Sequence, residues 1–438
     1  MASLFPFRAL RYASDRVRLE NVLTQPYDKI TPAMQERYYA ASPYNLVRIE
    51  LGNSRLEPGG DVYAAAAAHL GRWRAEGILR QDAAASIYAY SQRFAVPGSE
   101  RAAERRGFIA LGQLEDYDRG IVFRHEQTHS GPKADRLNLL RATRAHSGQL
   151  FMLYSDPAKA VDRLLLSDRK ADVEITDEFG VVHRLWAIAD ASVIAQVQAL
   201  MAEQKLIIAD GHHRYETALT YRDERRSDAA SNTAPELSAK CANAPYERVM
   251  MTFVNMDAEG LVILPTHRVV HSLAMFDAEQ LLRGALRYFD IDPLPREVDA
   301  RGIHAALAGT TAETGLVAFT GERNVLLKAR REALAALLPE LSPQQRELDV
   351  VALHRVLLEK ILGISEVAIR EQRNVAYTRD AGEAIARVRS SQADAAFLMN
   401  AVRIEQMRDI AFAGGVLPQK STDFYPKLLS GLAIYAME

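Results

Sequence analysis

One short segment of the sequence, Asp210-Gly211-His212-His213-Arg214, holds several residues that suit phosphate chemistry. An apolar run ends there and good helix formers follow, which predicts a strand, a glycine turn and a helix start. Gly211 lets the backbone approach a ligand, and the free N–H groups of a helix start favour an anion. Arg214 can bind phosphate oxygens in a bidentate way, and the histidines add donors. Asp210 could hold Mg²⁺ or orient a histidine.

The alternative for this segment is a plain turn, in which Asp210 caps the helix and both histidines are exposed. We interpret the five residues together as a phosphate-binding turn, because so many donors gather at one strand end.

A second segment, His125-Glu126-Gln127-Thr128-His129, has the zinc-protease pattern of two histidines four residues apart. That pattern requires a helix, and Ser130-Gly131-Pro132 follows at once and predicts that none continues. We therefore expect no zinc. The hypothesis that we prefer places His125 and Glu126 in a polar loop that contributes to substrate binding.

Lys133, Asp135 and Arg136 follow this loop. They could be simple charges at a helix start, since residues 135–144 look helical. They could equally supply a lysine and an arginine to a phosphate and a carboxylate to Mg²⁺.

Apolar and polar residues alternate from Leu46 to Leu51, which predicts a strand with Arg48 and Glu50 on one face. On such a strand the Glu50 carboxylate would lie beside the Arg48 guanidinium. The alternative is a solvated face on an edge strand.

The segment between Pro418 and Lys427 packs lysines, hydroxyls and a tyrosine between two prolines. We interpret it as a binding loop for an anionic substrate, with a polar surface loop as the alternative. Its candidate residues are Lys420, Ser421, Thr422, Tyr425 and Lys427. Thr266-His267-Arg268 follows another apolar run, so we expect His267 and Arg268 to face the same cleft.

The elements that must position these residues alternate between short apolar runs and longer amphipathic segments, which predicts a mixed α/β fold. Expected strands are 46–51, 86–90, 108–114, 150–154, 205–209 and 248–254. Expected helices are 31–40, 62–76, 192–204, 215–224, 277–287 and 350–362. We expect a mobile surface loop at 227–245. A run of helix-like segments begins shortly after residue 260, which predicts two domains. We expect a catalytic part at 1–260 and a helix-rich part at 261–438 that closes the cleft.

Composition narrows the function classes. The 438 residues carry a net charge of −2 from 54 basic and 56 acidic side chains, which argues against nucleic-acid or membrane partners. Cys241 is the single cysteine, so neither an internal disulfide nor a cysteine-rich metal site is possible. No secretory signal is visible, and we expect a cytoplasmic protein.

The Asp-Gly-His-His-Arg string resembles the signature of the family called domain of unknown function 1015. Further matching blocks are Pro26–Ile30, Asn45–Glu50, His125–Thr128, Pro132–Arg136, Pro265–Arg268 and Pro418–Lys427. The turn also resembles, more distantly, the motif of the partition-protein B and sulfiredoxin superfamily, which includes kinases of free serine. Sulfiredoxins need a cysteine at the turn, where this chain has His212 and His213.

The resemblance implies a partition-protein B-like catalytic part with a nucleotide or pyrophosphate site and Mg²⁺-assisted transfer of phosphate to free serine. It also raises Glu50 to a candidate general base. A phosphatase on the same site and a non-catalytic nucleotide-responsive module remain as alternatives.

Overall fold

The structure is a computed structural model that describes residues 2–126, 130–165, 170–232 and 243–437. Its contacts divide the chain into two compact units. The first unit holds Met1–Arg124, Thr128–Val262 and Pro426–Glu438, and the second holds His125–Gln127 and Ile263–Tyr425. The C-terminal segment thus returns to the first unit, which a single boundary near residue 260 does not describe.

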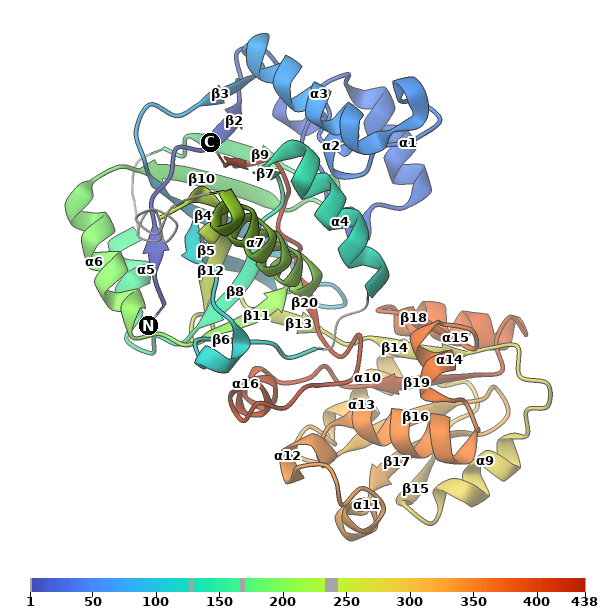
Figure 1. Cartoon of the computed structure of the whole chain (residues 1–438). Helices are drawn as coiled ribbons and strands as arrows, with labels where there is room; N and C mark the ends of the chain where they lie inside the picture. Colours follow the sequence, from blue (N-terminus) through green and yellow to red (C-terminus); the bar gives the residue numbers. More distant parts are fainter. Residues whose placement is uncertain (1, 127–129, 166–169, 233–242, 438) are drawn as a thin grey trace. The chain divides into compact units, whose positions relative to one another are not determined.

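The first unit is built on a mixed sheet that has nine strands among the described residues. Its order is β6-β11-β8-β12-β5-β4-β10-β9, with β1 paired to β5 (Figure 1). The strands are β1 (Leu4–Phe5), β4 (Ile87–Ala95), β5 (Ala102–Gln113), β6 (Val122–Phe123), β8 (Leu150–Tyr154), β9 (Val173–Thr176), β10 (Val182–Ile188), β11 (Leu206–Asp210) and β12 (Arg248–Asn255). The pairs β8–β12 and β6–β11 are parallel, and the other pairs are antiparallel.

The described part of this unit also has two smaller strand pairings, seven α-helices and several short 3-10 helices. The pairings are β2 (Leu10–Tyr12) with β3 (Leu79–Gln81) and β7 (Ala145–His146) with β21 (Tyr435–Ala436). The helices are α1 (Pro32–Ala41), α2 (Val47–Glu50), α3 (Val62–Ala75), α4 (Ser130–Thr143), α5 (Ala160–Leu165), α6 (Ala191–Ala202) and α7 (His212–Asn232).

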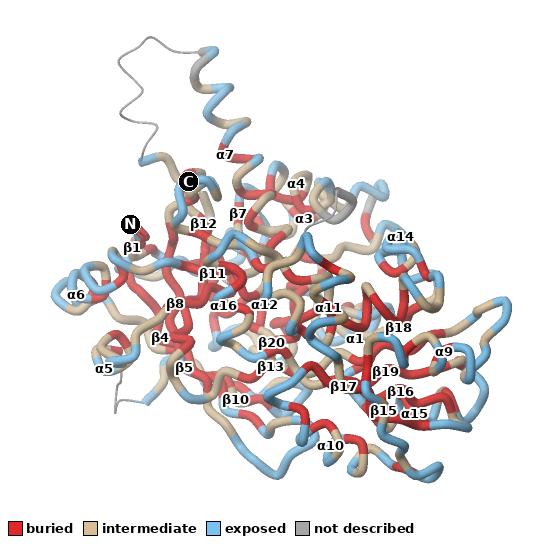
Figure 2. The backbone as a smooth tube through the Cα atoms, turned by 90° about the horizontal axis from the view of Figure 1, so that it is seen from below, coloured by how far each residue is buried: buried red, intermediate tan, exposed pale blue. Residues whose placement is uncertain are grey.

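The core of the first unit lies on the sheet, where Figure 2 shows buried residues along the central strands. Every residue of β8 is buried, as expected for a strand in the middle of a covered sheet. Apolar residues of α5, α6 and the start of α7 join one face of the strands in a single cluster. Local capping fixes where helices begin: the Asp190 carboxylate accepts hydrogen bonds from Ser192 and Val193 at the start of α6.

The strand predicted at 46–51 is wrong, because this segment forms the short helix α2. The Asn45 side chain accepts a hydrogen bond from the Val47 N–H at 2.9 Å at the start of this helix. Six alternating residues fit one buried helical turn as well as a strand. Arg48 and Glu50 are two residues apart on a helix and therefore do not share a face.

Two other boundaries differ from the expectation. The helix expected at 135–144 begins already at Ser130, with Pro132 in its first turn, where a proline costs no hydrogen bond. Helix α7 continues to Asn232, into the loop expected at 227–245. Residues 127–129, which include Thr128 and His129 of the zinc-like string, and 233–242 lie outside the described residues.

The second unit contains an antiparallel sheet of six strands in its described part, in the order β15-β17-β16-β19-β14-β18. These strands are β14 (His267–Val270), β15 (Phe289–Leu294), β16 (Gly315–Phe319), β17 (Asn324–Ala329), β18 (Val375–Thr378) and β19 (Ala395–Met399). Strands β13 (Val262–Leu264) and β20 (Asp423–Tyr425) form a separate pair.

Helices are numerous in this unit. They are α9 (Ala278–Ala285), α10 (Ala300–Ala308), α11 (Arg331–Leu337), α12 (Pro343–Arg346), α13 (Asp349–Ala352), a π-helix (Leu353–Ile361), α14 (Glu366–Arg370), α15 (Ala381–Arg389) and α16 (Ile404–Phe412). The chain is thus a mixed α/β protein, as predicted. Among the described residues, no helix combines the length and apolarity that crossing a bilayer requires.

Candidate functional site

The predicted strand, glycine turn and helix start are confirmed: β11 ends at Asp210 and α7 begins at His212. Gly211 has a φ of +96°, a conformation that favours glycine. The first carbon of any side chain there would lie 2.9 Å from Leu150 Cδ2 and 3.1 Å from Arg214 Nη2. The backbone of the turn therefore favours glycine, and a larger residue would press against the ends of the Leu150 and Arg214 side chains.

Arg214 folds back over this turn. Its Nη1 donates a hydrogen bond to the carbonyl oxygen of Gln149 at 2.5 Å, and its Nη2 lies 4.0 Å from Asp210 Oδ2. Its side chain is 16% exposed. A guanidinium held between a carbonyl and a carboxylate keeps further N–H groups for an incoming anion, which suits phosphate binding.

Several cations surround the Asp210 carboxylate. Burial alone would raise its pKa, but the charges of Lys427, Arg214, Lys29 and His212 outweigh burial and hold the pKa well below its usual range. Lys427 Nζ lies 3.8 Å from Asp210 Oδ2. The carboxylate is therefore ionised at neutral pH, within a group of side chains that carries more positive than negative charge.

Two buried side chains hold the segment that carries Lys427. Gln92 Nε2 donates to the Lys427 carbonyl oxygen at 2.8 Å, and Arg105 Nη2 donates to the Pro426 carbonyl oxygen at 2.5 Å. Burial lowers the pKa of Arg105 to about 10, against the opposing charges of Tyr90 and Asp210. The backbone at Pro426 and Lys427 is thus held by side chains of the sheet.

Glu50 lies beside Arg214, although it comes from α2 and not from a strand. A side chain at Gly148 would have its first carbon 3.1 Å from both Glu50 Oε1 and Arg214 Nη1, so the two groups converge on this glycine. Arg136 Nη1 donates to the Glu50 carbonyl oxygen at 2.7 Å and lies 3.4 Å from Glu50 Oε2. The Arg136 guanidinium also stacks over Tyr27, 4.2 Å from the ring centre.

A small cavity of about 50 Å³ lies among these groups. Glu50, Arg136 and Arg214 line it together with His146 and Thr217. The Thr217 hydroxyl is buried and has no hydrogen-bond partner in the described part of the chain. Burial, and then the charge of Arg214, lower the pKa of His146 to about 4, so this imidazole is neutral at pH 7. The cavity has room for a few water molecules or a small polar group.

Other predicted residues of the first unit have different partners. Arg48 stacks over Tyr39, 4.3 Å from the ring centre, and lies 3.9 Å from Glu57 Oε1. Its predicted place beside Glu50 on one strand face is therefore wrong, because the helix turns the two side chains apart. Lys133 forms an ion pair with Glu216, which joins α4 to α7.

Asp135 was predicted as a magnesium ligand. Its carboxylate accepts hydrogen bonds from Arg136 Nη2 at 2.5 Å and from the Tyr63 hydroxyl at 2.9 Å. These contacts engage both of its oxygens, and the predicted role stays a prediction. His213 is partly buried on the first turn of α7.

In the second unit, Arg268 is fully buried and holds the loop that was predicted to bind substrate. Its Nη2 donates to the carbonyl oxygens of Gln419 and Lys420 at 3.2 and 3.1 Å, and its Nε lies 3.2 Å from His354 Nε2. Burial lowers the pKa of Arg268 to about 10. Lys420 has a φ of +58°, which is uncommon for a residue other than glycine. The hydrogen bonds from Arg268 can maintain this conformation.

His125 and Thr422 form a second polar contact in this unit. His125 Nε2 lies 2.7 Å from Thr422 Oγ1, which in turn lies 3.3 Å from Glu126 Oε1. The Ser421 hydroxyl donates to the Pro418 carbonyl oxygen. The structure thus brings His125, Glu126 and Thr422 together within the second unit, and the predicted role of these residues and of Ser421 in binding stays a prediction.

His267 and Tyr425 complete the predicted set. Burial, followed by the charges of His304 and Arg268, lowers the pKa of His267 to about 4, so its imidazole is neutral at pH 7. The Arg379 guanidinium lies over Tyr425, 5.9 Å from the ring centre.

The chain offers one carboxylate for a divalent cation at the turn. In the described part, no three His, Cys, Asp or Glu side chains are grouped as they would be around a metal ion. Mg²⁺ is commonly held by one or two carboxylates together with substrate phosphates and water, and Asp210 suits that arrangement. Bound in this way, Mg²⁺ would supply positive charge to a transferring phosphoryl group.

The fold is that of a mixed α/β protein, with a glycine turn between a strand and a helix. The chain belongs to the family described as "Protein of unknown function (DUF1015)", whose model matches residues 4–351. None of the curated proteins matches it significantly.

The chain also matches several solved structures, with low sequence identity. A conserved hypothetical protein from Pyrococcus furiosus is 12% identical with a TM-score of 0.34, over 74% of this chain and 95% of that one. A free serine kinase in complex with AMP is 12% identical with a TM-score of 0.36, over 74% and 92%. SbnI with C-terminal truncation, from Staphylococcus aureus, is 9% identical with a TM-score of 0.35, over 74% and 87%.

Proposed function

We propose that the chain is a phosphotransferase acting on a small metabolite, with free serine as the first choice of acceptor. A nucleotide or pyrophosphate would be the donor, used with Mg²⁺. The observation that carries this proposal is the convergence of Arg214, which covers the glycine turn, and Glu50 at Gly148. A cation for phosphate and a carboxylate for a hydroxyl thus lie side by side.

The turn supports binding of the donor phosphates. A helix start favours an anion, and Arg214 and Lys427 flank the turn at which α7 begins. Phosphoryl transfer depends mainly on positioning and on neutralising charge, and these groups supply both. Asp210 would contribute the protein's ligand to Mg²⁺ bound between the turn and the phosphates.

Glu50 supports activation of the acceptor. A general base must come within about 2.6–3.2 Å of the hydroxyl from which it takes a proton. The cavity of about 50 Å³ beside Glu50 has room for a hydroxymethyl group but not for a nucleotide. Arg136, which contacts both the backbone and the carboxylate of Glu50, would keep that carboxylate in place.

Calorimetric titration with pyrophosphate, ADP and ATP tests the donor half of this proposal. Arg214→Ala should weaken donor binding by about ten- to a hundredfold, because a charge-assisted hydrogen bond is worth roughly 1.5–3 kcal/mol. Arg225→Ala is the matched control, since Arg225 lies on the same helix and pairs with Asp228 at 3.1 Å. Equal donor affinity in Arg214→Ala and Arg225→Ala would contradict the assignment.

A further inference from the structure

A trough crosses four strands of the first unit, and its residues are not used by the proposed reaction. Strand register places Glu174, Arg184, Ser91 and Arg106 side by side on β9, β10, β4 and β5. In such a row, adjacent side chains lie about 5 Å apart on one face of the sheet. Ser91 is thus flanked by an arginine on each neighbouring strand.

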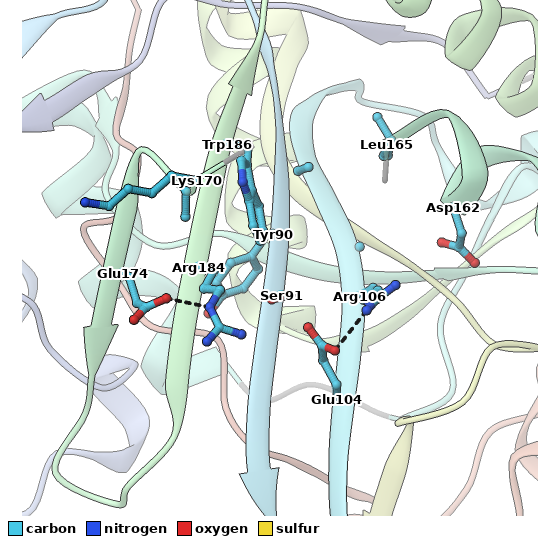
Figure 3. Close-up of a pocket in the computed structure, with 13 residues that line it drawn as sticks. Tyr90, Ser91, Glu104, Arg106, Asp162, Leu165, Lys170, Glu174, Arg184 and Trp186 are labelled. Atoms are coloured by element: carbon cyan, nitrogen blue, oxygen red, sulfur yellow. Dashed lines mark hydrogen bonds and ion pairs between the residues drawn. The ribbon is translucent and has the colours of Figure 1, made fainter. Parts of the chain in front are cut away.

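The next row toward the core is Trp186, Ala89 and Phe108. Because the central strand β4 presents only Ala89 and Ser91 between larger neighbours, a hollow of about 370 Å³ forms over it. Figure 3 shows Trp186 on one side of this hollow and residues of α5 on the other. Its volume lies within the usual range for sites of small molecules.

The floor of the trough contains a buried hydroxyl group. Ser91 is 3% exposed, and its hydroxyl interacts with the Glu104 carboxylate. Arg184 uses Nε to bind Glu174 at 2.6 Å, and Arg106 uses Nη2 to bind Glu104 at 3.0 Å. Each guanidinium thus keeps further N–H groups that could bind a ligand above Ser91.

This trough is separate from the turn at Asp210. Side chains alternate between the two faces of a sheet along each strand. Gln92, which follows Ser91, and Arg105, which precedes Arg106, contact the segment that carries Lys427. The trough therefore lies on the face of the sheet opposite that segment.

We propose that the trough is a second binding site, for a mononucleotide, with the base against Trp186 and the phosphate above Ser91 between Arg106 and Arg184. An indole face suits a flat heteroaromatic ring, and two guanidiniums suit one phosphate. The carboxylates of Glu104 and Asp162 line the same hollow and can accept hydrogen bonds from ribose hydroxyls or a ring amino group. This mixture of charges fits a monophosphate better than a polyanion.

Trp186 provides the signal that tests this proposal, because the chain has two tryptophans. In a Trp73→Phe protein, the fluorescence of Trp186 is titrated with AMP, with adenosine and with inorganic phosphate. AMP should change the fluorescence in a saturable way, adenosine should bind more weakly, and phosphate alone should change little. The reciprocal Trp186→Phe protein should show no such change.

Substitutions in the trough then locate the site. Ser91→Leu, which fills the hollow, and Arg184→Ala, at a partly exposed position, should each weaken AMP binding at least tenfold. Both variants should form product at the normal rate if the proposed transferase activity exists, so the two proposals can fail separately. The inference is overturned if AMP leaves Trp186 fluorescence unchanged. It is also overturned if folded Ser91→Leu and Arg184→Ala bind AMP normally, or if only Arg214→Ala weakens the signal.

Discussion

Asp210→Asn offers a sharp test of the electrostatics at the turn, because its effect should reverse with Mg²⁺. The carboxylate lies 3.8 Å from Lys427 Nζ and 4.0 Å from Arg214 Nη2, so a phosphate bound to these cations would lie close to a negative charge. Since the pKa of Asp210 is held well below its usual range, that charge is fully present at pH 7.

The size of the effect follows from Coulomb's law. At a separation of about 6 Å and an effective dielectric constant of about 20–40, the repulsion between Asp210 and one phosphate charge is about 1.5–3 kcal/mol. In EDTA, Asp210→Asn should therefore bind pyrophosphate about tenfold or more tightly than the natural protein. With Mg²⁺ present the order should reverse, because the variant lacks the carboxylate that would hold the ion.

Calorimetry with pyrophosphate, first in EDTA and then in Mg²⁺, measures the pyrophosphate affinity without and with the metal ion. Asp82→Asn is the matched control, since it removes a carboxylate that pairs with Arg11 at 2.7 Å elsewhere in the first unit. If folded Asp210→Asn binds pyrophosphate no more tightly than Asp82→Asn in EDTA, the phosphate does not lie at this turn and the reasoning is refuted.

Three further predictions concern catalysis, the turn and pH. Glu50→Gln should lower the rate of phosphoserine formation by about a hundredfold or more while donor affinity stays constant, and an unchanged rate would make Glu50 structural. Gly211→Ala should lower the free energy of unfolding by about 2 kcal/mol or more and weaken phosphate binding. Gly120 is the matched control, because it also has a positive φ but has open space around it. Gly120→Ala should therefore lower the free energy of unfolding by less and leave phosphate binding intact. Equal losses in denaturant titrations would show that the contacts around Gly211 do not matter. Burial raises the pKa of Asp349 to about 7, so the folded state binds this proton more tightly than the unfolded chain and loses stability as pH rises from about 4 to 7. Asp349→Asn should therefore gain stability over the natural protein by about 1–3 kcal/mol at pH 8 relative to pH 5, and parallel melting curves would contradict this.

Local sequence patterns predicted the parts of the site that depend on neighbouring residues. The apolar run before Asp210, the glycine and the following helix formers lie within one short segment, and the structure forms the expected turn there. The segment around Glu50 was misassigned because an alternating pattern of six residues does not separate a strand from one buried helical turn.

Other parts of the site depend on contacts between distant segments. The Gln149 carbonyl that holds Arg214 comes to the turn because β8 pairs with β11. Gly148, where Glu50 and Arg214 converge, carries no sequence signal that separates it from any loop glycine. In the sequence, Arg105 cannot be told from an exposed charged residue on a strand. In the structure it is buried and holds the segment that carries Lys427.

The most direct test of the account is formation of phosphoserine. Purified protein is incubated with Mg²⁺ and serine, with pyrophosphate, ADP and ATP in separate tubes, and the products are measured by mass spectrometry. The account predicts phosphoserine with at least one donor and its loss in Arg214→Ala and Glu50→Gln. Release of phosphate from added phosphoserine, without its formation, would instead favour a phosphatase on the same site. The absence of phosphoserine with every donor, from folded protein, would contradict the proposed serine kinase.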